Sequence, residues 1–420
     1  MMATMNDFDR LNPADNGENG RSLPDGWEWS TLGVVTENFD GKRVPVKASN
    51  RETMNGEYPY YGASGIIDHV NDYLFDGDFL LIAEDGANLL SRSTPIAFQA
   101  HRKFWVNNHA HIIKTRNGMP LGFLEHYLNS LDLKFSVTGT AQPKLTQANL
   151  NKIPVPIPPL PEQERIVNRI DELFSDLEAG MAALERVQVG LKRYKASVLK
   201  AACEGKLFES REIENGELPE GWQRVTVGDV AISMKNGIYK PAEFYADDGI
   251  ACLRMYNIED GSIIWKDIKR MILTDDEIET YRLMPGDILV NRVNSRELVG
   301  KAAVIPDGLE TLVYESKNIR LKINDELADS KFVNFCFGAF RQQYFNRNAQ
   351  QVVGMASINQ TQIAQMPIPL PPLDEQRRIV AEVERRLSVV GEVESAVEVG
   401  LVRAGRLRQA VLRSAFEGRL

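Results

Sequence analysis

The chain repeats itself, and this internal repeat constrains its fold more than any other feature. Residues 154–167 read PVPIPPLPEQERIV, and residues 367–380 read PIPLPPLDEQRRIV. Each copy opens a long segment of helical character. The two segments also close alike, with VLKAACEGKL at 198–207 and VLRSAFEGRL at 411–420. A duplicated chain of this kind has a pseudo-two-fold axis, which suits partners or ligands that come in pairs.

A third repeated motif, Leu-Pro-x-Gly-Trp, stands before each proline run, at 23–27 and 218–222. The order is therefore globule, proline run and long helix, twice. We predict an α+β fold in which two mixed α/β domains are separated by two long antiparallel coiled-coil helices. The predicted parts are a polar N-terminal tail at 1–20, a first domain at 21–160, a first helix at 161–208, a second domain at 209–373 and a second helix at 374–420.

Apolar residues recur at alternating steps of four and three along the first helical segment, which is the heptad pattern of a coiled coil. The seam is Ile166, Ile170, Leu173, Leu177, Gly180, Leu184, Val187, Leu191, Tyr194 and Val198, where only Gly180 fits poorly. Arg386 and Gly400 interrupt the equivalent seam of the second segment, and we expect Leu387 and Leu401 to replace them.

Both helical segments are acidic in their first half and basic in their second half. Antiparallel pairing sets acid beside base, whereas parallel pairing sets like charges together, so we predict antiparallel helices. The alternative, that these charges are only solvated helix faces, stays open. The proline runs should be extended and stiff, because proline fixes its own φ and disfavours helix in its predecessor. Apolar residues alternate with the prolines and should pack, which argues against a flexible linker.

The two globules diverge in sequence and read as short strands with turns rich in Gly, Asn and Asp. Strands are predicted at 78–83, 250–254, 287–291 and 301–305, and helices at 121–131 and 330–344. Divergent globules on matching helices suggest that the helices are common to related chains while the globules carry variable specificity.

Composition narrows the class of protein. A chain of 420 residues with 43% hydrophobic residues can form two to four packed units. The first 21 residues are polar and acidic without the apolar core of a signal peptide, and no apolar run reaches the ~20 residues of a bilayer span. Cys203, Cys252 and Cys336 are widely spaced, which fits a reducing cytoplasm. The net charge of −9 argues mildly against a non-specific nucleic-acid coat but allows a local basic face.

Polar, basic and aromatic residues gather in particular loops of both globules. Arg matches guanine edges, Asn and Gln match adenine edges, and Lys meets phosphate, so these loops are candidate DNA contacts. Taken singly, each is more often a solvated loop residue. The candidates are Lys42, Arg43, Arg51, Tyr61, Asn88, Arg92, Gln142, Lys144, Lys235, Lys240, Arg254, Tyr256, Asn257, Arg292, Asn294, Arg296, Gln350 and Gln351.

Catalytic motifs are scarce. The sequence has neither a Gly-rich nucleotide loop nor the Asn/Asp-Pro-Pro-Tyr/Phe tetrapeptide of amino-methyltransferases. His109 and His111 share one face of a predicted strand, but no nearby Cys or Asp set completes a metal site, so we predict core or loop histidines and no metal. Asp307, Glu315 and Lys317 match the loose pattern of metal-dependent nucleases, although Asp307-Gly308 also reads as a turn.

The doubled order of motifs resembles the specificity subunit of type I restriction–modification systems. The resemblance covers essentially the whole chain after about residue 21. The matching positions lie where each helix begins: Pro158, Pro159, Leu160, Glu162 and Gln163, and then Pro371, Pro372, Leu373, Glu375 and Gln376.

The resemblance implies that two target-recognition domains each read one half of a split, asymmetric site on double-stranded DNA. It implies that the helices act as a spacer and dock two methyltransferase subunits, which restriction subunits join. It also implies that this chain has no catalytic residues and binds no cofactor, while the partners use S-adenosylmethionine and Mg-ATP. The DNA target, its spacer length and whether the system restricts do not follow from the sequence. A metal-dependent nuclease and a coiled-coil scaffold without a DNA role are the alternatives.

Overall fold

The computed structural model describes residues 23–139, 142–208, 217–352 and 355–420, with the side chains of 350–352 excepted. The chain forms two compact units. Unit 1 runs up to Leu184 and includes Val399–Leu420, while unit 2 is Glu185–Glu398. We call their sheet-bearing parts domain 1 and domain 2. Among the described residues, no helix combines the length and the apolar character needed to cross a membrane.

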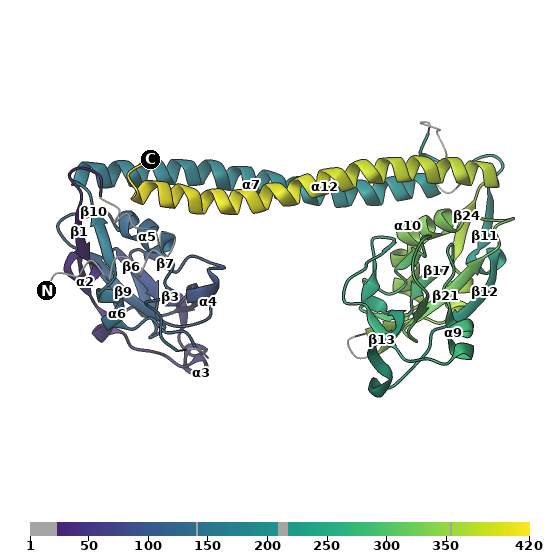
Figure 1. Ribbon diagram of the computed structural model, residues 1–420, viewed down its shortest axis with the longest axis horizontal. Helices are drawn as coiled ribbons and strands as arrows, with labels where there is room; N and C mark the ends of the chain where they lie inside the picture. The colour runs from purple at the N-terminus through teal and green to yellow at the C-terminus, as the bar shows by residue number, and fades with distance from the viewer. Residues whose placement is uncertain (1–22, 140–141, 209–216, 353–354) are drawn as a thin grey trace. The chain divides into compact units, whose positions relative to one another are not determined.

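Domain 1 is built around a four-stranded antiparallel sheet of order β2-β9-β6-β7 (Figure 1). These strands are β2 (Thr36–Asn38), β9 (Ala110–Thr115), β6 (Phe79–Ala83) and β7 (Ala97–Ala100). All five residues of β6 are buried because apolar layers cover both faces of the sheet. Leu80 and Ile82 face one cluster, while Phe79 and Leu81 face another, as the two-residue period of a strand requires.

A second sheet of domain 1 has the order β4-β3-β8-β5, and β3 is parallel to β8. Its strands are β3 (Asn55–Gly62), β4 (Gly65–Val70), β5 (Phe75–Asp76) and β8 (Lys103–Val106). Helix α5 (Leu121–Ser130) packs with the first sheet and confirms the helix predicted at 121–131. The short helices are α2 (Leu32–Val35), η1 (Asp40–Lys42), α3 (Ala48–Arg51), α4 (Asn88–Ser91) and α6 (Gln147–Asn151).

Domain 2 contains a four-stranded antiparallel sheet with the corresponding order, β12-β21-β17-β19. The strands are β12 (Ala231–Asn236), β21 (Asn318–Ile323), β17 (Ile288–Asn291) and β19 (Ala302–Val304). The register corresponds as well, since Ala83 pairs with Ala110 in domain 1 and Asn291 pairs with Asn318 in domain 2. The predicted mixed α/β domains and their internal repeat are confirmed.

Besides the two-stranded sheet of its proline run, the described part of domain 2 contains three further small sheets and several helices. Strand β13 (Tyr245–Leu253) lies between β16 (Lys269–Met271) and β20 (Leu312–Tyr314). Helix α10 (Ser330–Asn348) confirms the helix predicted at 330–344. The remaining elements are β14 (Ile258–Glu259), β15 (Ser262–Ile263), β18 (Val293–Asn294), β22 (Gln350–Val352), β23 (Met355–Ser357), α8 (Val227–Val230), α9 (Asp275–Tyr281), α11 (Gln360–Ala364), η2 (Ala242–Phe244) and η3 (Met255–Asn257).

Each proline run forms one strand of a two-stranded antiparallel sheet. β10 (Pro154–Ile157) pairs with β1 (Glu28–Thr31), and β24 (Pro367–Leu370) pairs with β11 (Gln223–Thr226). A two-stranded sheet tolerates proline because one edge of each strand needs no ladder hydrogen bonds. Val155 and Ile368 are buried between the prolines. The runs are therefore extended and packed, as predicted.

The two long helices are α7 (Leu160–Cys203) and α12 (Leu373–Phe416), each of 44 residues. In unit 1, Arg408 of α12 pairs with Glu178 of α7, with 3.2 Å between nitrogen and oxygen. In unit 2, Lys195 of α7 pairs with Glu394 of α12 at 2.7 Å. Each unit thus sets the late part of one helix beside the early part of the other, and the predicted antiparallel pairing is confirmed.

The predicted seam is buried at the ends of α7 but not in its middle. Ile166, Ile170 and Val198 are buried, whereas Val187 and Tyr194 are 42% and 44% exposed. The ends of α7 are more deeply buried because they belong to the hydrophobic clusters of the domain cores, whereas Val187 and Tyr194 belong to neither. The seam positions Leu173, Leu177, Leu184 and Leu191 are half-buried.

Gly400, which interrupts the seam of α12, lies under Leu184. A Cβ atom at Gly400 would be 3.0 Å from the Leu184 Cδ1 atom. The missing side chain therefore allows the two helices to approach within unit 1.

The repeated Glu-Gly-Lys/Arg-Leu motif ends each helix. Gly205 and Gly418 have φ of 72° and 69°, the left-handed conformation that closes a helix. The Lys206 amide donates to the Ala201 carbonyl at 2.9 Å, and the Arg419 amide donates to the Ser414 carbonyl at 2.9 Å. Each of these bonds runs from an amide to the carbonyl five residues earlier, as in the Schellman motif. This shared helix end explains why the Glu-Gly-Lys/Arg-Leu sequence occurs twice.

Candidate nucleic-acid interface

Five charged side chains converge beside the central sheet of domain 1. Asp40 and Arg43 come from the turn after β2, Glu84 follows β6, His111 lies on β9, and Lys144 lies in the segment 142–146. Arg43 Nη1 lies 2.7 Å from Glu84 Oε2, and Lys144 Nζ lies 3.2 Å from Glu84 Oε1. We call these five residues the charged cluster.

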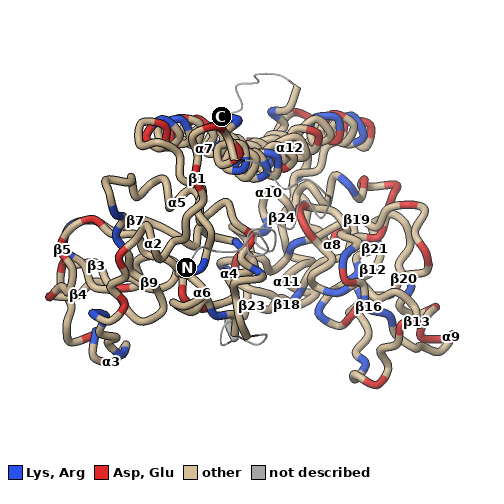
Figure 2. The backbone as a smooth tube through the Cα atoms, turned by 60° about the vertical axis from the view of Figure 1, so that its left-hand side comes forward, with Lys and Arg blue, Asp and Glu red and all other residues tan. Residues whose placement is uncertain are grey.

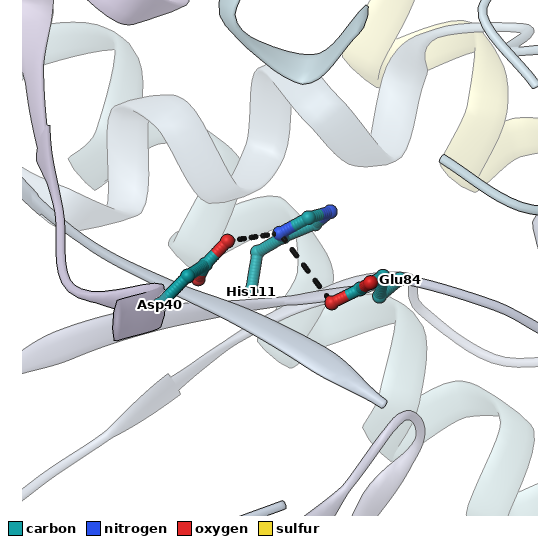
Figure 3. Close-up of side chains that lie close together, drawn as sticks. All are labelled: Asp40, Glu84 and His111. Carbon is teal, nitrogen blue, oxygen red and sulfur yellow. Dashed lines mark hydrogen bonds and ion pairs between the residues drawn. The ribbon is translucent and has the colours of Figure 1, made fainter. Parts of the chain in front are cut away.

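His111 lies at the centre of the charged cluster and is 1% exposed. Its Nδ1 atom lies 2.6 Å from Asp40 Oδ2 and 3.8 Å from Glu84 Oε2 (Figure 3). Its Nε2 atom lies 2.7 Å from the Leu145 carbonyl oxygen. A carboxylate and a carbonyl can only accept, so the geometry is satisfied when both ring nitrogens carry a proton and donate. The ring therefore joins the Asp40 carboxylate to the Leu145 carbonyl.

The two acids of the charged cluster stay ionised. Burial by itself raises the pKa of Asp40. Hydrogen bonds from His111 and the Ile112 amide, together with the charge of Arg43, lower it by more than burial raises it, so the pKa lies below 3.8. Burial likewise raises the pKa of Glu84, and Arg43, His111 and Lys144 together bring it below its ordinary value.

The charged cluster does not suit a metal ion, although ligand atoms of Asp40, Glu84 and His111 lie within 4.8 Å of one another. The nitrogen that faces both acids donates a proton to Asp40, and Arg43 and Lys144 already neutralise Glu84. An added cation would meet three cationic side chains. The sequence placed His111 as a core or loop histidine without acidic neighbours, and the second half of that expectation was wrong: the fold brings Asp40 to it from 71 residues away.

Domain 2 has a neutral network at the corresponding place. Asn294 Nδ2 donates to Asn291 Oδ1 at 2.8 Å, and Asn291 Nδ2 donates to Asn318 Oδ1 at 3.1 Å. Asn318 Nδ2 then donates to the Leu253 carbonyl at 3.3 Å. All three asparagines are buried. Ile319 takes the register position of His111, because it pairs with Val290 as His111 pairs with Ile82.

In both domains a polar segment is hydrogen-bonded to the residue that follows one inner strand of the sheet, β6 in domain 1 and β17 in domain 2. In domain 1, the Leu145 amide donates to the Glu84 carbonyl at 2.8 Å, and Lys144 pairs with Thr138 through backbone hydrogen bonds. In domain 2, the Ile358 amide donates to the Arg292 carbonyl at 2.9 Å, and β23 pairs with β18 and β22. The predicted DNA contacts near residues 142–144 and 350–351 therefore occupy corresponding places.

Five of the predicted contact residues have exposed side chains: Lys42, Gln142, Lys144, Tyr256 and Arg296. Acidic and basic positions are interspersed along the backbone of both units (Figure 2). A local contact surface in either domain therefore depends on which individual basic side chains are free to reach outward.

Eight other predicted residues are held inside their own domain. Arg43 is bound to Glu84 and donates to the Ala110 carbonyl, and Arg254 donates to Glu315 at 3.2 Å. The other six are held by similar bonds: Arg51, Asn88, Arg92, Lys240, Asn257 and Asn294. These bonds give the eight residues a structural role in the chain as it stands.

Three predicted residues are intermediate. Tyr61 packs against Phe98 and Phe104, and the ammonium group of Lys235 lies 5.0 Å from the Tyr281 ring. Arg292 donates to the Ser316 carbonyl at 3.4 Å. The side chains of Gln350 and Gln351 lie outside the described residues.

Sequence reasoning overlooked two exposed aromatic residues. Tyr239 is 78% exposed and directly precedes Lys240, while Phe135 is 61% exposed and lies just before Thr138. Tyr239 lies beside Lys240, a predicted contact, and two residues after Gly237. An aromatic residue next to a candidate basic residue is a signal that could have pointed to it.

The candidate nuclease residues do not form a free carboxylate pair. Glu315 is buried and accepts hydrogen bonds from Arg254 Nε at 3.2 Å and from the Met255 amide at 3.1 Å. Asp307 is exposed before Gly308, whose φ is 77°. The structure thus favours the turn interpretation of Asp307-Gly308.

The motif at the start of each helix fastens that helix to its domain. Gln163 and Gln376 are buried, and each donates from Nε2 to the carbonyl of the first proline of a Pro-Pro pair, Pro158 or Pro371, at 2.8 Å. Gln376 Oε1 also accepts from the Asp329 amide at 2.8 Å. Glu375 accepts from the Trp222 indole at 3.1 Å, which joins the two repeated motifs.

The remaining motif residues lie at the surface. Pro159, Leu160 and Pro372 are exposed, and Glu162 forms an ion pair with Arg165. Leu373 is partly buried.

Comparison with known proteins gives a consistent result. The family described as "Type I restriction modification DNA specificity domain" matches residues 24–186 and 219–386. The StySPI specificity subunit of Salmonella potsdam is 25% identical over 96% of this chain and 91% of its own length. The EcoKI specificity subunit of Escherichia coli (strain K12) is 28% identical over 95% of this chain and 90% of its own length. A solved chain from work on complex assembly and conformational transition of the type I R-M system superposes with a TM-score of 0.70 at 20% identity, over 95% of this chain and 100% of its own.

Proposed function

Because the chain belongs to the family of type I restriction–modification specificity subunits, we propose that each of its two domains reads one half of a bipartite, asymmetric DNA site. The chain is the part of such a system that determines DNA sequence specificity. The observation that supports two separate readers is the corresponding sheet order of the domains, combined with different polar groups at the same place. A shared framework with different chemistry is what two different half-sites require.

In the proposed DNA contacts, the exposed residues meet DNA, while the buried and half-buried ones shape the surface. The first group is Lys42, Gln142, Lys144, Tyr256 and Arg296, with Gln350 and Gln351 at the corresponding place in domain 2. Tyr239 joins it because its ring is exposed beside Lys240. An alanine substitution at a base-reading member should cost about 1–3 kcal/mol of discrimination at one position of one half-site.

We further propose that the long helices set the gap between the half-sites and dock two methyltransferase subunits, which restriction subunits join. Apolar residues on the helices support a docking role. In unit 2, Val189 and Val389 are 51% and 53% exposed, and in unit 1, Val399 and Val402 are 64% and 51% exposed. In this proposal the chain is non-catalytic and cytoplasmic, and the partners use S-adenosylmethionine and Mg-ATP.

Domain exchange tests the two-reader proposal. Replacing residues 23–152 by the first domain of another specificity subunit should change one half of the methylated motif completely and leave the other half unchanged. Methylation mapping of cells that carry the wild-type or the exchanged gene provides the measurement. A functional exchange that alters both halves would contradict the proposal.

The mass of the purified complex tests the docking proposal. Two corresponding helix starts and two corresponding helix ends should bind two methyltransferase subunits for each specificity chain. A complex with a single methyltransferase subunit would exclude this arrangement. Val399→Glu should weaken the binding of a subunit at unit 1, whereas Gly190→Ala, at an open helix position, is the matched control.

A further inference from the structure

His111 is more than a filled core position, because its side chain joins the turn after β2 to a segment that backbone hydrogen bonds otherwise attach to the residues after β6 and to Thr138. Its ring bridges the Asp40 carboxylate, in the turn after β2, and the Leu145 carbonyl, in the segment 142–146. That segment also carries Gln142 and Lys144, two exposed residues of the proposed DNA contact set.

The bridge is held firmly at its acidic end. Asp40 Oδ1 accepts from the Ile112 amide at 2.9 Å, and Arg43 Nε donates to the Asp40 carbonyl at 3.0 Å. His111 therefore transmits the fixed position of the turn to the Leu145 carbonyl. Charge-assisted hydrogen bonds of this kind are shorter and stronger than neutral ones, and their directionality fixes geometry.

At the other end, the bridge orients the segment on both sides of Leu145. The Leu145 side chain is fully buried, and its amide is bonded to the Glu84 carbonyl. Lys144 comes just before it, and Thr146 follows as the N-cap of α6, where its hydroxyl accepts from the Asn149 amide. Loss of the His111 bond would leave a carbonyl unpaired at the point where the exposed and buried parts of the segment meet.

We propose that His111 is a positioning residue for DNA recognition, which fixes Lys144 and Gln142 through Leu145 and thereby sets the sequence preference of domain 1. The proposal rests on the reading of one half-site by domain 1. His111 touches no DNA in this proposal. Domain 2 has no counterpart of the bridge at this register position, since Ile319 stands there, so the second half-site serves as a control within the same complex.

The test uses the complete complex of the specificity chain with its methyltransferase partner. Methylation rates are measured on DNA pools in which one half-site is varied while the other keeps its cognate sequence. The measured ratio is the methylation rate on cognate DNA divided by the rate on DNA with one substituted base pair. His111→Gln should lower this ratio by about tenfold for the half-site of domain 1, which is the effect of losing one specific contact. The same ratio for the half-site of domain 2 should not change.

His101→Gln is the matched control. His101 also pairs with an aspartate, Asp78, at 2.8 Å, but both side chains are exposed, at 57% and 68%. This variant should keep both ratios. If His111→Gln left both ratios unchanged, or lowered both equally, the positioning role would be refuted.

A second variant keeps the test informative if His111→Gln fails to fold. Asp40→Asn can keep the Ile112 amide bond through its oxygen and donate from its amide nitrogen to His111 Nδ1, but it removes the charge, so it should produce a smaller change in the same half-site. Equal ratios for Asp40→Asn and wild type would overturn the proposal. Nitrogen-15 spectra of the imidazole groups provide a direct readout, since the signal of the His111 Nδ1 atom, which faces Asp40, should differ between the wild-type complex and Asp40→Asn.

The outcome can be separated from that of the proposed function. If the domain exchange does not assign one half-site to each domain, the two-reader proposal itself fails. If the wild type shows that assignment and the His111 variant matches it, only the positioning role fails.

Discussion

The two domains share a sheet order and differ in the polar groups beside it. Domain 1 holds charged groups there, centred on His111, whereas domain 2 holds a neutral chain of three asparagine amides. Both sets of polar groups lie near the end of β6 or β17, close to the segment that carries the predicted DNA contacts at 142–144 or 350–351. The comparison teaches that this framework tolerates either ionic or neutral chemistry at the same place.

The largest expected effect on stability tests the neutral network of domain 2. Asn291→Ala removes the acceptor of Asn294 and the donor to Asn318, so it should lower the free energy of unfolding of domain 2 by about 2–3 kcal/mol. Thermal unfolding followed by calorimetry provides the measurement. Asn346→Ala, at an exposed position, should stay within about 0.5 kcal/mol of wild type. Equal losses for the two variants would show that the amide chain contributes no special stability.

The next effect concerns the glycine that ends each long helix, a feature that both units share. Gly205→Ala and Gly418→Ala place a side chain at positive φ and against Pro219 and Pro24, respectively. Each should cost about 1–3 kcal/mol, and the two costs should be similar because the junctions are equivalent. The melting temperatures of both variants test this, with Gly190→Ala, in an open helical position, as a neutral or slightly stabilising control. Clearly unequal costs would break the equivalence of the junctions.

The smallest effect is a difference in acid sensitivity between the two domains. Asp40 and Glu84 have lowered pKa values, so the stability that they contribute is present above their ordinary values of 3.8 and 4.5 and is lost as pH falls through the folded pKa. In domain 2, burial raises the pKa of Asp287, so protonation of this group favours the folded state as pH falls.

Hydrogen exchange can compare strand β9 with strand β21 as the pH falls from about 5 to about 3. Protection of β9 should fall more than protection of β21. Asp40→Asn, which cannot titrate at residue 40, should reduce the difference. Parallel losses of protection in the two strands would mean that the charged cluster does not control the acid response of domain 1.

Much of the architecture could be predicted because it depends on local patterns. The proline runs had to be extended, the glycines of the repeated Glu-Gly motif had to stop a helix, and the charge order of the helices favoured antiparallel pairing. The uneven burial of the α7 seam could not be predicted, because burial of its two ends depends on the domain cores, and these are built from residues far away in the sequence.

Which polar loop residues are exposed could be predicted much less well, for a physical reason. Arg43, Asn257 and Gln142 look alike in sequence as polar loop residues, yet the first two are bonded inside their domains and the third is exposed. Whether a polar side chain faces solvent depends on which acceptors the fold brings within about 3 Å, and these lie tens of residues away.

The sequence by itself determined the duplication, the two helices with their polarity and the family, because each is recorded in residues close together along the chain. Only the tertiary structure decided that Asp40, Glu84 and His111 meet, and that His111 holds the Leu145 carbonyl. Side chains of three separate segments must reach one buried place before their charges can interact, and no local pattern encodes that convergence.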